Sequence, residues 1–215
     1  MMKLVYFNGR GLAETSRMVL AIGGEEYEDV RYPLKIIDWS KHQMEKEEFE
    51  KDKADGKLVR SLNKLPYLEV DGVVVPQSKS IERFLAKKYN LMGTSDIEAL
   101  RIDSLCECVR DFKDAYQSVR KAENKVEATN EWFTKTLVEK LSLLENLVDG
   151  NGFTVGETLS LSDVVLYAFI TQFFDNKEAS MNATLASPKI RSVIEKVSTV
   201  PQLVSWIEKR PKTDF

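Results

Sequence analysis

Few side chains in this sequence are of the types that carry out covalent or metal chemistry. The 215 residues include two cysteines, Cys106 and Cys108, and one histidine, His42. Cysteines two positions apart on a helix do not face each other, and the sequence has no C-x-x-C dithiol motif. A zinc site needs about four ligands, which these residues do not supply. We therefore expect two buried, inert thiols, a solvated His42 and no bound metal.

A candidate binding site lies where a helix begins. Residues 63–85, NKLPYLEVDGVVVPQSKSIERFL, combine two short β-rich runs with a helix that opens at Gln77 and Ser78. A helix N-terminus presents free N–H groups and partial positive charge, which suit a carboxylate. The same residues are also typical of a plain N-cap serine. This end of the helix is therefore a candidate anion site.

The elements before residue 90 follow the order β-α-β, connector, β-β-α. Residues 3–7 and 27–32 are typical of strands, and the apolar spacing from Leu12 predicts a helix between them. A β-α-β order favours parallel strands. Asp71 and Gly72, between two β-rich runs, predict a type I′ hairpin.

The remaining segments complete this order. Residues 38–64 are polar, and we expect a short surface helix and a loop there. Ile81, Phe84, Leu85 and Tyr89 mark one face of the helix that follows the hairpin. The order is that of a thioredoxin-like α/β domain spanning residues 1–89.

The rest of the chain is predicted to be all-helical. Residues 90–96 form a plausible linker, and apolar residues recur at helical spacing through residues 97–215, with a helix that Pro188 opens and another that begins at Pro201. Ser160 stands three residues before Asp163, which predicts a capping box at the start of a helix.

Composition excludes several classes of function. The chain is 43% hydrophobic and 30% charged, with a net charge of −3 and a pI near 5.5. This is the composition of a folded globular protein without the basic surface of a nucleic-acid binder. No apolar run approaches the roughly 18 residues of a membrane span, and the first residues lack a signal peptide. We expect a cytoplasmic protein with no membrane or nucleic-acid partner.

A thioredoxin-like domain followed by a helical domain resembles the cytosolic glutathione transferases. The resemblance covers nearly the whole chain and is carried by LVYFNGRGLAE, DW at 38–39, LPYLEVDG, PQSKSIERFLAKKYNLMG, SLSD and the terminal EKRPKTDF. The sequence is most similar to the tyrosine-type enzymes, especially the sigma class, which includes the glutathione-dependent prostaglandin synthases. Glutathione would be a co-substrate.

The resemblance implies that Tyr6 is the catalytic residue. Its O–H would donate to the sulfur of glutathione and stabilise the thiolate, which is the nucleophile. Lowering the thiol pKa by about two units takes about 2.7 kcal/mol, and one hydrogen bond to a charged group supplies about 1.5–3 kcal/mol. Without the resemblance, Tyr6 is more typical of an aromatic residue that is buried in the core on a strand.

The resemblance also assigns the residues that bind glutathione. Pro66 matches a cis-proline that exposes the backbone of Leu65 to the cysteinyl part, although by itself it is also typical of a trans proline at a strand start. Ser78, with Gln77 beside it, would hold the γ-glutamyl carboxylate. The full set implied is Phe7, Trp39, Lys41, Lys64, Leu65, Pro66, Gln77, Ser78 and Asp103.

Further implications concern the second substrate and the oligomer. Asn8, Gly9 and Arg10 would help to line a pocket for a small hydrophobic electrophile, together with part of the helix after residue 100 and the C-terminus. Asp103 matches an acidic residue that reaches glutathione from a partner subunit, which implies a homodimer.

Two features depart from the sigma pattern. The first turn reads RGLAE, with Leu12 where an arginine normally supports the thiolate. The stretch between Trp39 and Lys64 is longer than in sigma members. The family has a lysine soon after the tryptophan, but Gln43 occupies the position where that lysine is expected, and Lys41 is the nearest lysine. Relatives that use an N-terminal cysteine are excluded because residues 1–105 contain none, and Ser16 lies too far along its helix for a serine-type enzyme.

Three functions remain open from the sequence. The first is a glutathione transferase that conjugates the thiolate to small electrophiles by proximity and anion stabilisation. The second is a non-catalytic ligand carrier or structural protein on the same fold, which the loss of the arginine at Leu12 favours. The third is a glutathione-dependent isomerase such as a prostaglandin D synthase.

Overall fold

The computed structural model describes residues 1–38 and 43–213. The chain forms two compact units. The first consists of Met1–Leu85 together with Lys209–Phe215, and the second is Ala86–Glu208. We call them the sheet unit and the helical unit. Helix α3 (Ser78–Lys88) passes from the first into the second. The division into a binding domain that ends at residue 89 and a helical domain from residue 97 stays a prediction.

The sheet unit is built on a four-stranded mixed sheet in the order β2-β1-β5-β6. Its strands are β1 (Met2–Phe7), β2 (Tyr27–Tyr32), β5 (Tyr67–Val70) and β6 (Val73–Pro76). Strands β1 and β2 are parallel, whereas β5 pairs antiparallel with both β1 and β6. This confirms the expected β-α-β and hairpin order. Asp71 and Gly72 have φ of 50° and 79°, as a type I′ turn requires.

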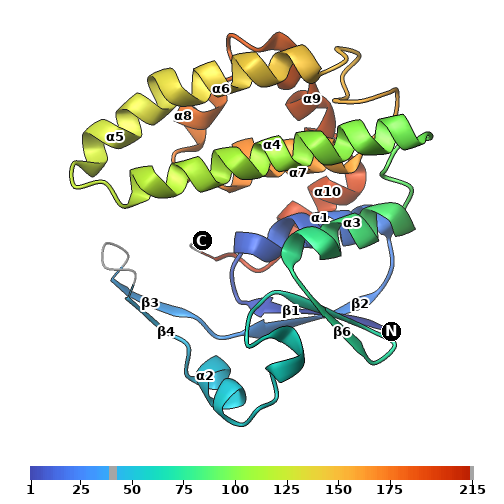
Figure 1. The fold of residues 1–215 in the computed structure, drawn as a ribbon, viewed down its shortest axis with the longest axis vertical. Helices are drawn as coiled ribbons and strands as arrows, with labels where there is room; N and C mark the ends of the chain where they lie inside the picture. The colour runs from blue at the N-terminus through green and yellow to red at the C-terminus, as the bar shows by residue number, and fades with distance from the viewer. Residues whose placement is uncertain (39–42, 214–215) are drawn as a thin grey trace. The chain divides into compact units, whose positions relative to one another are not determined.

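Helices α1 (Glu14–Gly23) and α3 cover one face of this sheet (Figure 1). A short 3-10 turn, Gly11–Ala13, leads from β1 into α1. The core between these layers contains Leu4, Val19, Leu68, Ile81 and Leu85, each at most 1% exposed. Burying each such side chain contributes about 1.5–3 kcal/mol, which makes this interface the main source of stability of the unit.

The polar segment after β2 holds a feature that the sequence analysis missed. Besides the expected surface helix α2 (Glu47–Ala54), a two-stranded sheet forms from β3 (Lys35–Asp38) and β4 (Gln43–Glu45), and a 3-10 turn spans Val59–Ser61. Our expectation of only a helix and a loop was wrong because strands this short and this exposed show no alternating apolar pattern.

One aromatic residue anchors the charged helix α2. Phe49 is its only buried residue, and its ring lies edge-on to Phe7 at 5.2 Å and to Tyr32 at 6.0 Å between centroids. Tyr32 also donates a hydrogen bond of 2.8 Å to Asp52. A helix without a continuous apolar face is thus attached through a single ring that packs beside the end of β1.

Two burial expectations need correction. Phe84 was placed on the buried face of α3, but it is 46% exposed, because the residues that contact the sheet are Ile81 and Leu85. Cys106 is buried as expected, whereas Cys108, two positions further on and pointing to another side of the helix, is only half-buried, although burial still raises the pKa of its thiol. Both cysteines are free thiols.

The helical unit packs around α7 (Leu161–Gln172), which is buried on nearly every side. The long helix α4 (Asp96–Arg120) and α9 (Pro188–Ser198), both within the stretch of helical apolar spacing, pack against it (Figure 1). The other helices are α5 (Lys125–Glu131), α6 (Leu137–Leu144), α8 (Lys177–Asn182) and α10 (Pro201–Lys209). No helix in residues 1–38 and 43–213 is long and apolar enough to cross a membrane.

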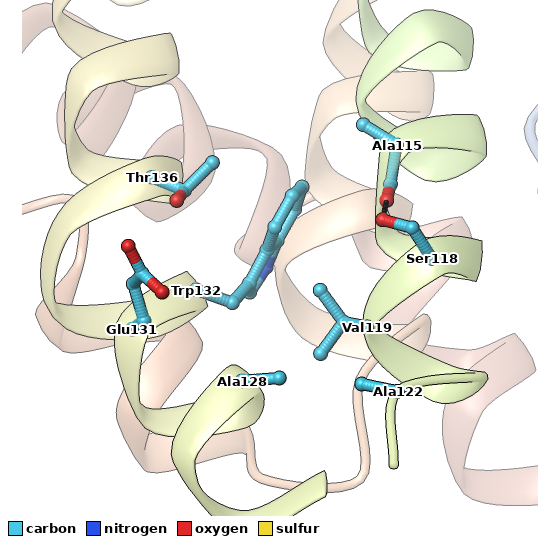
Figure 2. Close-up of a pocket in the computed structure, with 8 residues that line it drawn as sticks. All are labelled: Ala115, Ser118, Val119, Ala122, Ala128, Glu131, Trp132 and Thr136. Carbon is cyan, nitrogen blue, oxygen red and sulfur yellow. Dashed lines mark hydrogen bonds between the residues drawn. The ribbon is translucent and has the colours of Figure 1, made fainter. Parts of the chain in front are cut away.

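Within the stretch of helical apolar spacing, residues 132–147 do not form one continuous helix. This segment begins as a π-helical turn, Trp132–Thr136, continues as α6 and ends in a 3-10 turn, Glu145–Leu147. A hollow of about 320 Å³ lies between the π-helical turn and the end of α4, as Figure 2 shows. Ala115, Ser118, Val119, Ala122, Ala128, Glu131, Trp132 and Thr136 line it. None of these residues was predicted to bind either substrate.

The capping box at the start of α7 is present as expected. Asp163 is fully buried and accepts hydrogen bonds from the backbone N–H groups of Ser160, at 2.7 Å, and Thr154, at 2.6 Å. The Ser160 hydroxyl donates a third bond of 2.7 Å to the same carboxylate. Burial raises the pKa of Asp163, and the bonds from Ser160 and Thr154 counteract that rise. The box therefore ties the preceding loop to the central helix.

We expect Ser160→Ala to lower the free energy of unfolding by about 2 kcal/mol, because it removes a buried donor from a buried carboxylate. Ser95→Ala is the matched control, since Ser95 caps α4 at an exposed site through a bond of 3.2 Å from the Glu98 N–H. The control should cost about 1 kcal/mol or less. Urea unfolding followed by circular dichroism measures both, and an equal loss for the two variants would contradict the prediction.

Candidate functional site

The strand register brings the main predicted residues into one row at one edge of the sheet. Tyr67 pairs with Val5 on one side and with Pro76 on the other. Continued one position beyond these pairs, the register directs Tyr6 toward Pro66 and Pro66 toward Gln77, although β5 begins at Tyr67 and β6 ends at Pro76. Adjacent strands lie about 4.8 Å apart, so a row across three strands spans about 10 Å, the length of an extended tripeptide. Tyr6 and Pro66, 60 positions apart in the sequence, are thus brought to the same edge of the sheet.

The phenol of Tyr6 is held by the turn that follows its strand. Its hydroxyl oxygen accepts a hydrogen bond of 3.2 Å from the backbone N–H of Leu12. A phenol that accepts one bond still has its own hydrogen to donate. Burial raises the pKa of Tyr6 above its ordinary value of 10, and the Leu12 N–H and the Arg17 cation counteract this. Tyr6 is therefore a protonated donor at neutral pH.

The close approach of the turn depends on Gly11. Its φ is 37°, a left-handed conformation that favours glycine, and a Cβ at this position would lie 2.5 Å from the Tyr6 hydroxyl oxygen. The ring that carries this oxygen is rigid, so it would have to move as a whole. Gly11 therefore allows the backbone to reach the phenol.

The peptide bond between Leu65 and Pro66 is cis, as the resemblance implied. The two preceding residues, Leu62 and Asn63, have φ of 58° and 55°, so the chain turns sharply before β5. The side-chain oxygen of Asn63 is buried and has no hydrogen-bond partner in the described part of the chain. Lys64 is exposed beside it. The segment thus presents backbone and polar groups at the same edge as Tyr6.

The N-terminus of α3 has the features of an anion site. Gln77 is exposed with φ of 81°, and its carbonyl accepts the Ile81 N–H at 3.0 Å, so Ser78 begins the helix. The first turn has no acidic residue. It holds Lys79 instead, which pairs with the buried Glu82 at 2.9 Å. A non-glycine residue in a left-handed conformation at a helix start is typical of a constrained functional position.

The other predicted residues are placed less directly. The ring of Phe7 lies edge-on to the ring of Tyr6, with 5.6 Å between their centroids. Asp103 is half-buried on α4 in the helical unit. Trp39 and Lys41 lie outside the described residues. The glutathione-binding role of each stays a prediction.

The three residues assigned to the second substrate follow Tyr6 and Phe7. Asn8 is exposed, Gly9 is buried and Arg10 is half-buried. The Asn8 N–H donates a hydrogen bond of 2.8 Å to the Tyr32 carbonyl, so the first residue after β1 stays attached to the end of β2. The Nε of Arg10 is buried without a hydrogen-bond partner in the described residues.

Sequence reasoning missed the charged residues beneath this turn. Arg17 on α1 is fully buried, and its Nη1 donates to the Gly9 carbonyl at 2.5 Å. Its Nε donates to Asp29, which also accepts from Arg31. The available signal was an arginine among apolar residues at the centre of a predicted buried helix.

In residues 1–38 and 43–213, no group of His, Cys, Asp and Glu side chains forms a metal site.

Comparison with known proteins now decides the family. The model of the glutathione S-transferase N-terminal domain matches residues 2–87, and that of the C-terminal domain matches residues 110–210. The crystal structure of monomeric Na-GST-3, a glutathione S-transferase from the hookworm Necator americanus, superposes with a TM-score of 0.82 at 30% identity and covers 100% of this chain and 99% of that one. This chain belongs to the glutathione S-transferase family.

Two curated relatives refine this membership. The hematopoietic prostaglandin D synthase of Gallus gallus is 31% identical over 214 residues, which are 98% of this chain and 97% of the relative. S-crystallin SL11 of Nototodarus sloanii is 26% identical over 219 residues, 99% of this chain and 98% of the relative. Both support the sigma-class character that the motifs indicated. They also show that full-length members of this glutathione S-transferase group carry different names and roles.

We expect Gly11→Ala to displace the Tyr6 ring and break the Leu12–Tyr6 hydrogen bond, because the new Cβ and the phenol oxygen cannot share the space. A displaced phenol would lose its hydrogen bond to the thiolate of glutathione, worth about 1.5–3 kcal/mol, so the rate of conjugation should fall about 10- to 100-fold. The measurement is kcat/KM with a chromogenic aryl halide.

Gly24→Ala is the matched control. Gly24 also has a left-handed φ, 64°, but a Cβ there has open space around it. The control therefore reports backbone strain alone, and its kcat/KM should stay within about twofold of wild type. Equal losses for the two variants would contradict a specific role for Gly11.

Proposed function

We propose that this protein is a glutathione transferase that activates the glutathione thiol through Tyr6 and conjugates it to small hydrophobic electrophiles. The observation that carries the proposal is the row of Tyr6, Pro66 and Gln77 at one sheet edge, with the Tyr6 phenol held by the Leu12 N–H. The homodimer and the cytoplasmic location expected from the resemblance belong to the same proposal.

The glutathione backbone would run along this row. Its γ-glutamyl carboxylate would accept hydrogen bonds from the free N–H groups at the start of α3, at Ser78. Gln77 would lie beside this carboxylate. Its cysteinyl part would pair with the backbone of Leu65, and its sulfur would then lie near Tyr6. Phe7, Trp39, Lys41, Lys64 and, from a partner subunit, Asp103 complete the proposed set.

The chemistry follows from the protonation states. A free thiol has a pKa of about 8.5, so at neutral pH most glutathione is not a nucleophile. A phenol that stays protonated donates to the thiolate and lowers the thiol pKa, and the released proton passes to solvent. The thiolate sulfur then attacks the electrophilic carbon, a sulfur–carbon bond forms, and the leaving group departs with the electron pair of the bond that breaks. Asn8, Gly9 and Arg10 would contact this electrophile.

Two alternatives remain, and each has its own support. Leu12 has no charge to stabilise the thiolate, which favours a non-catalytic binding or structural protein. Likeness to a prostaglandin D synthase favours a glutathione-dependent isomerase. The retained Tyr6, Gln77 and Ser78 favour an active enzyme over a carrier, because a carrier needs no phenol at the thiol.

The first test is an ultraviolet pH titration of bound glutathione in wild type and Tyr6→Phe. We expect a thiol pKa depressed by about two units in wild type and restored by one to two units in the variant, because one charge-assisted hydrogen bond is lost. The pKa of Tyr6 is raised, so its donor should persist through neutral pH and be lost only as the pH rises above 10.

The other outcomes separate the alternatives. Glutathione that binds with an unshifted pKa in both proteins would favour the carrier. No binding would reject the assignment of Gln77 and Ser78. An active thiolate without conjugation of aryl halides, but with turnover of a prostaglandin endoperoxide, would favour the isomerase.

The proposed homodimer can be tested at an exposed leucine. Leu62 is 63% exposed on the loop before Pro66, and Val59 and Phe84 are also exposed large apolar residues of the sheet unit. Such side chains are typical of an interface. We expect wild type to sediment with twice the chain mass of 24.6 kDa. Leu62→Asp should raise the dissociation constant of the dimer about 10- to 100-fold, because it removes the free energy gained by burying one leucine side chain.

Leu185→Asp is the control for this experiment. Leu185 is 65% exposed in the helical unit and has no expected role in assembly. Aspartate tolerates the left-handed conformation of Leu62, so the backbone is not strained by the test substitution. A wild type that sediments as a monomer would reject the homodimer.

A further inference from the structure

A fully buried arginine lies beneath the turn that presents the candidate catalytic tyrosine. Arg17 has 0% exposed side-chain area, and arginines are almost never fully buried unless they are paired. Three acceptors surround it: the Gly9 carbonyl at 2.5 Å, Asp29 at 3.1 Å and Glu14 at 3.8 Å. Its Nη2 is buried and has no hydrogen-bond partner in the described residues.

Asp29 extends this contact to the other side of the turn. One of its carboxylate oxygens accepts from Arg17, and the other pairs with Arg31 at 2.7 Å. Arg31 in turn donates to the side-chain oxygen of Asn8 at 3.4 Å. Arg31 also lies opposite Tyr6 in the parallel pairing of β1 with β2. Two guanidinium groups joined by one carboxylate thus hold two consecutive residues of the turn, Asn8 and Gly9.

Glu14 also pairs with Arg210, so the carboxylates of Asp29 and Glu14 lie among three guanidinium groups, those of Arg17, Arg31 and Arg210. The Arg17 carbon Cζ lies 5.9 Å from the centroid of the Tyr6 ring.

Tyr27 also faces the cluster, and burial and Asp29 raise its pKa, while Arg17 and Arg31 counteract this. Tyr27 is therefore protonated and uncharged at neutral pH.

We propose that Arg17 is a positioning residue of the glutathione site, which holds the Gly9 carbonyl from inside the fold and so fixes the turn that brings the Leu12 N–H to Tyr6. Asp29 orients Arg17 and links it to Arg31. The inference rests on the proposed function, in which Tyr6 donates to the thiol of glutathione.

The main test is Arg17→Lys, which keeps the charge but replaces the two-directional guanidinium by a single ammonium. An ammonium at this site cannot bind Gly9 and Asp29 in the same geometry. We expect the pKa of bound glutathione to rise by about one unit, which lowers the thiolate fraction about tenfold below that pKa. The KM for glutathione should stay within about threefold, because the carboxylate site at Ser78 is on another element.

Arg101→Lys is the control. Arg101 makes a two-pronged pair with Asp149 in the helical unit, at 2.6 and 3.2 Å. The control should lower the melting temperature without moving the thiol pKa. A merely structural role for Arg17 predicts the same pattern for Arg17→Lys, and a folded Arg17→Lys with the thiol pKa of wild type would overturn the inference.

A second measurement uses wild type alone, in case Arg17→Lys does not fold. The ¹⁵N resonances of the Arg17 guanidinium are followed by NMR while bound glutathione is titrated from thiol to thiolate. We expect them to shift with the midpoint of the thiol, and to stay constant with S-methylglutathione, which cannot ionise. Resonances that do not respond to the thiol would overturn the inference.

The failure of this inference can be told from the failure of the proposed function. If Tyr6→Phe raises the thiol pKa and Arg17→Lys does not, the transferase stands and the role of Arg17 is rejected. If glutathione bound to wild type has an unshifted pKa, the proposed function fails, and the role of Arg17 fails with it.

Discussion

The register of β1, β5 and β6 is the constraint on which the candidate site depends. Leu4 on β1 pairs with Leu68 on β5, and each is at most 1% exposed. A slip of one residue along this pair would turn Leu68 to the face of the sheet opposite Leu4. The pairing that packs these two core residues therefore also brings Tyr6, at the end of β1, toward Pro66, just before β5, in the candidate site.

Electrostatics around the first turn follow from burial. A guanidinium as deeply buried as that of Arg17 must be paired, and its partners are the carbonyl and carboxylates that hold the turn in place. Glycine at position 11 lets the backbone approach the phenol, and Leu12 contributes its N–H rather than its side chain. The local chemistry is thus carried largely by backbone groups, whose direction is set by charged residues that no substrate needs to touch.

The helical unit meets a different requirement. Its central helix α7 is apolar on nearly every side and is stable only when α4 and α9 cover it, while the capping box with Asp163 ties the preceding loop to its first turn. The hollow beside Trp132 lies within this unit and is lined mostly by small side chains.

The sequence by itself determined the order of the elements, the Asp71–Gly72 hairpin, the capping box and the family, because these depend on local patterns and motifs. It did not indicate the β3–β4 hairpin, the exposure of Phe84 or the buried pairing of Arg17 with Asp29 and Gly9. Short exposed strands have no periodic signal, and the exposure of one side chain depends on which neighbours cover it. An ion pair between residues 12 positions apart forms only when the sheet and α1 pack together, so tertiary structure alone decided it.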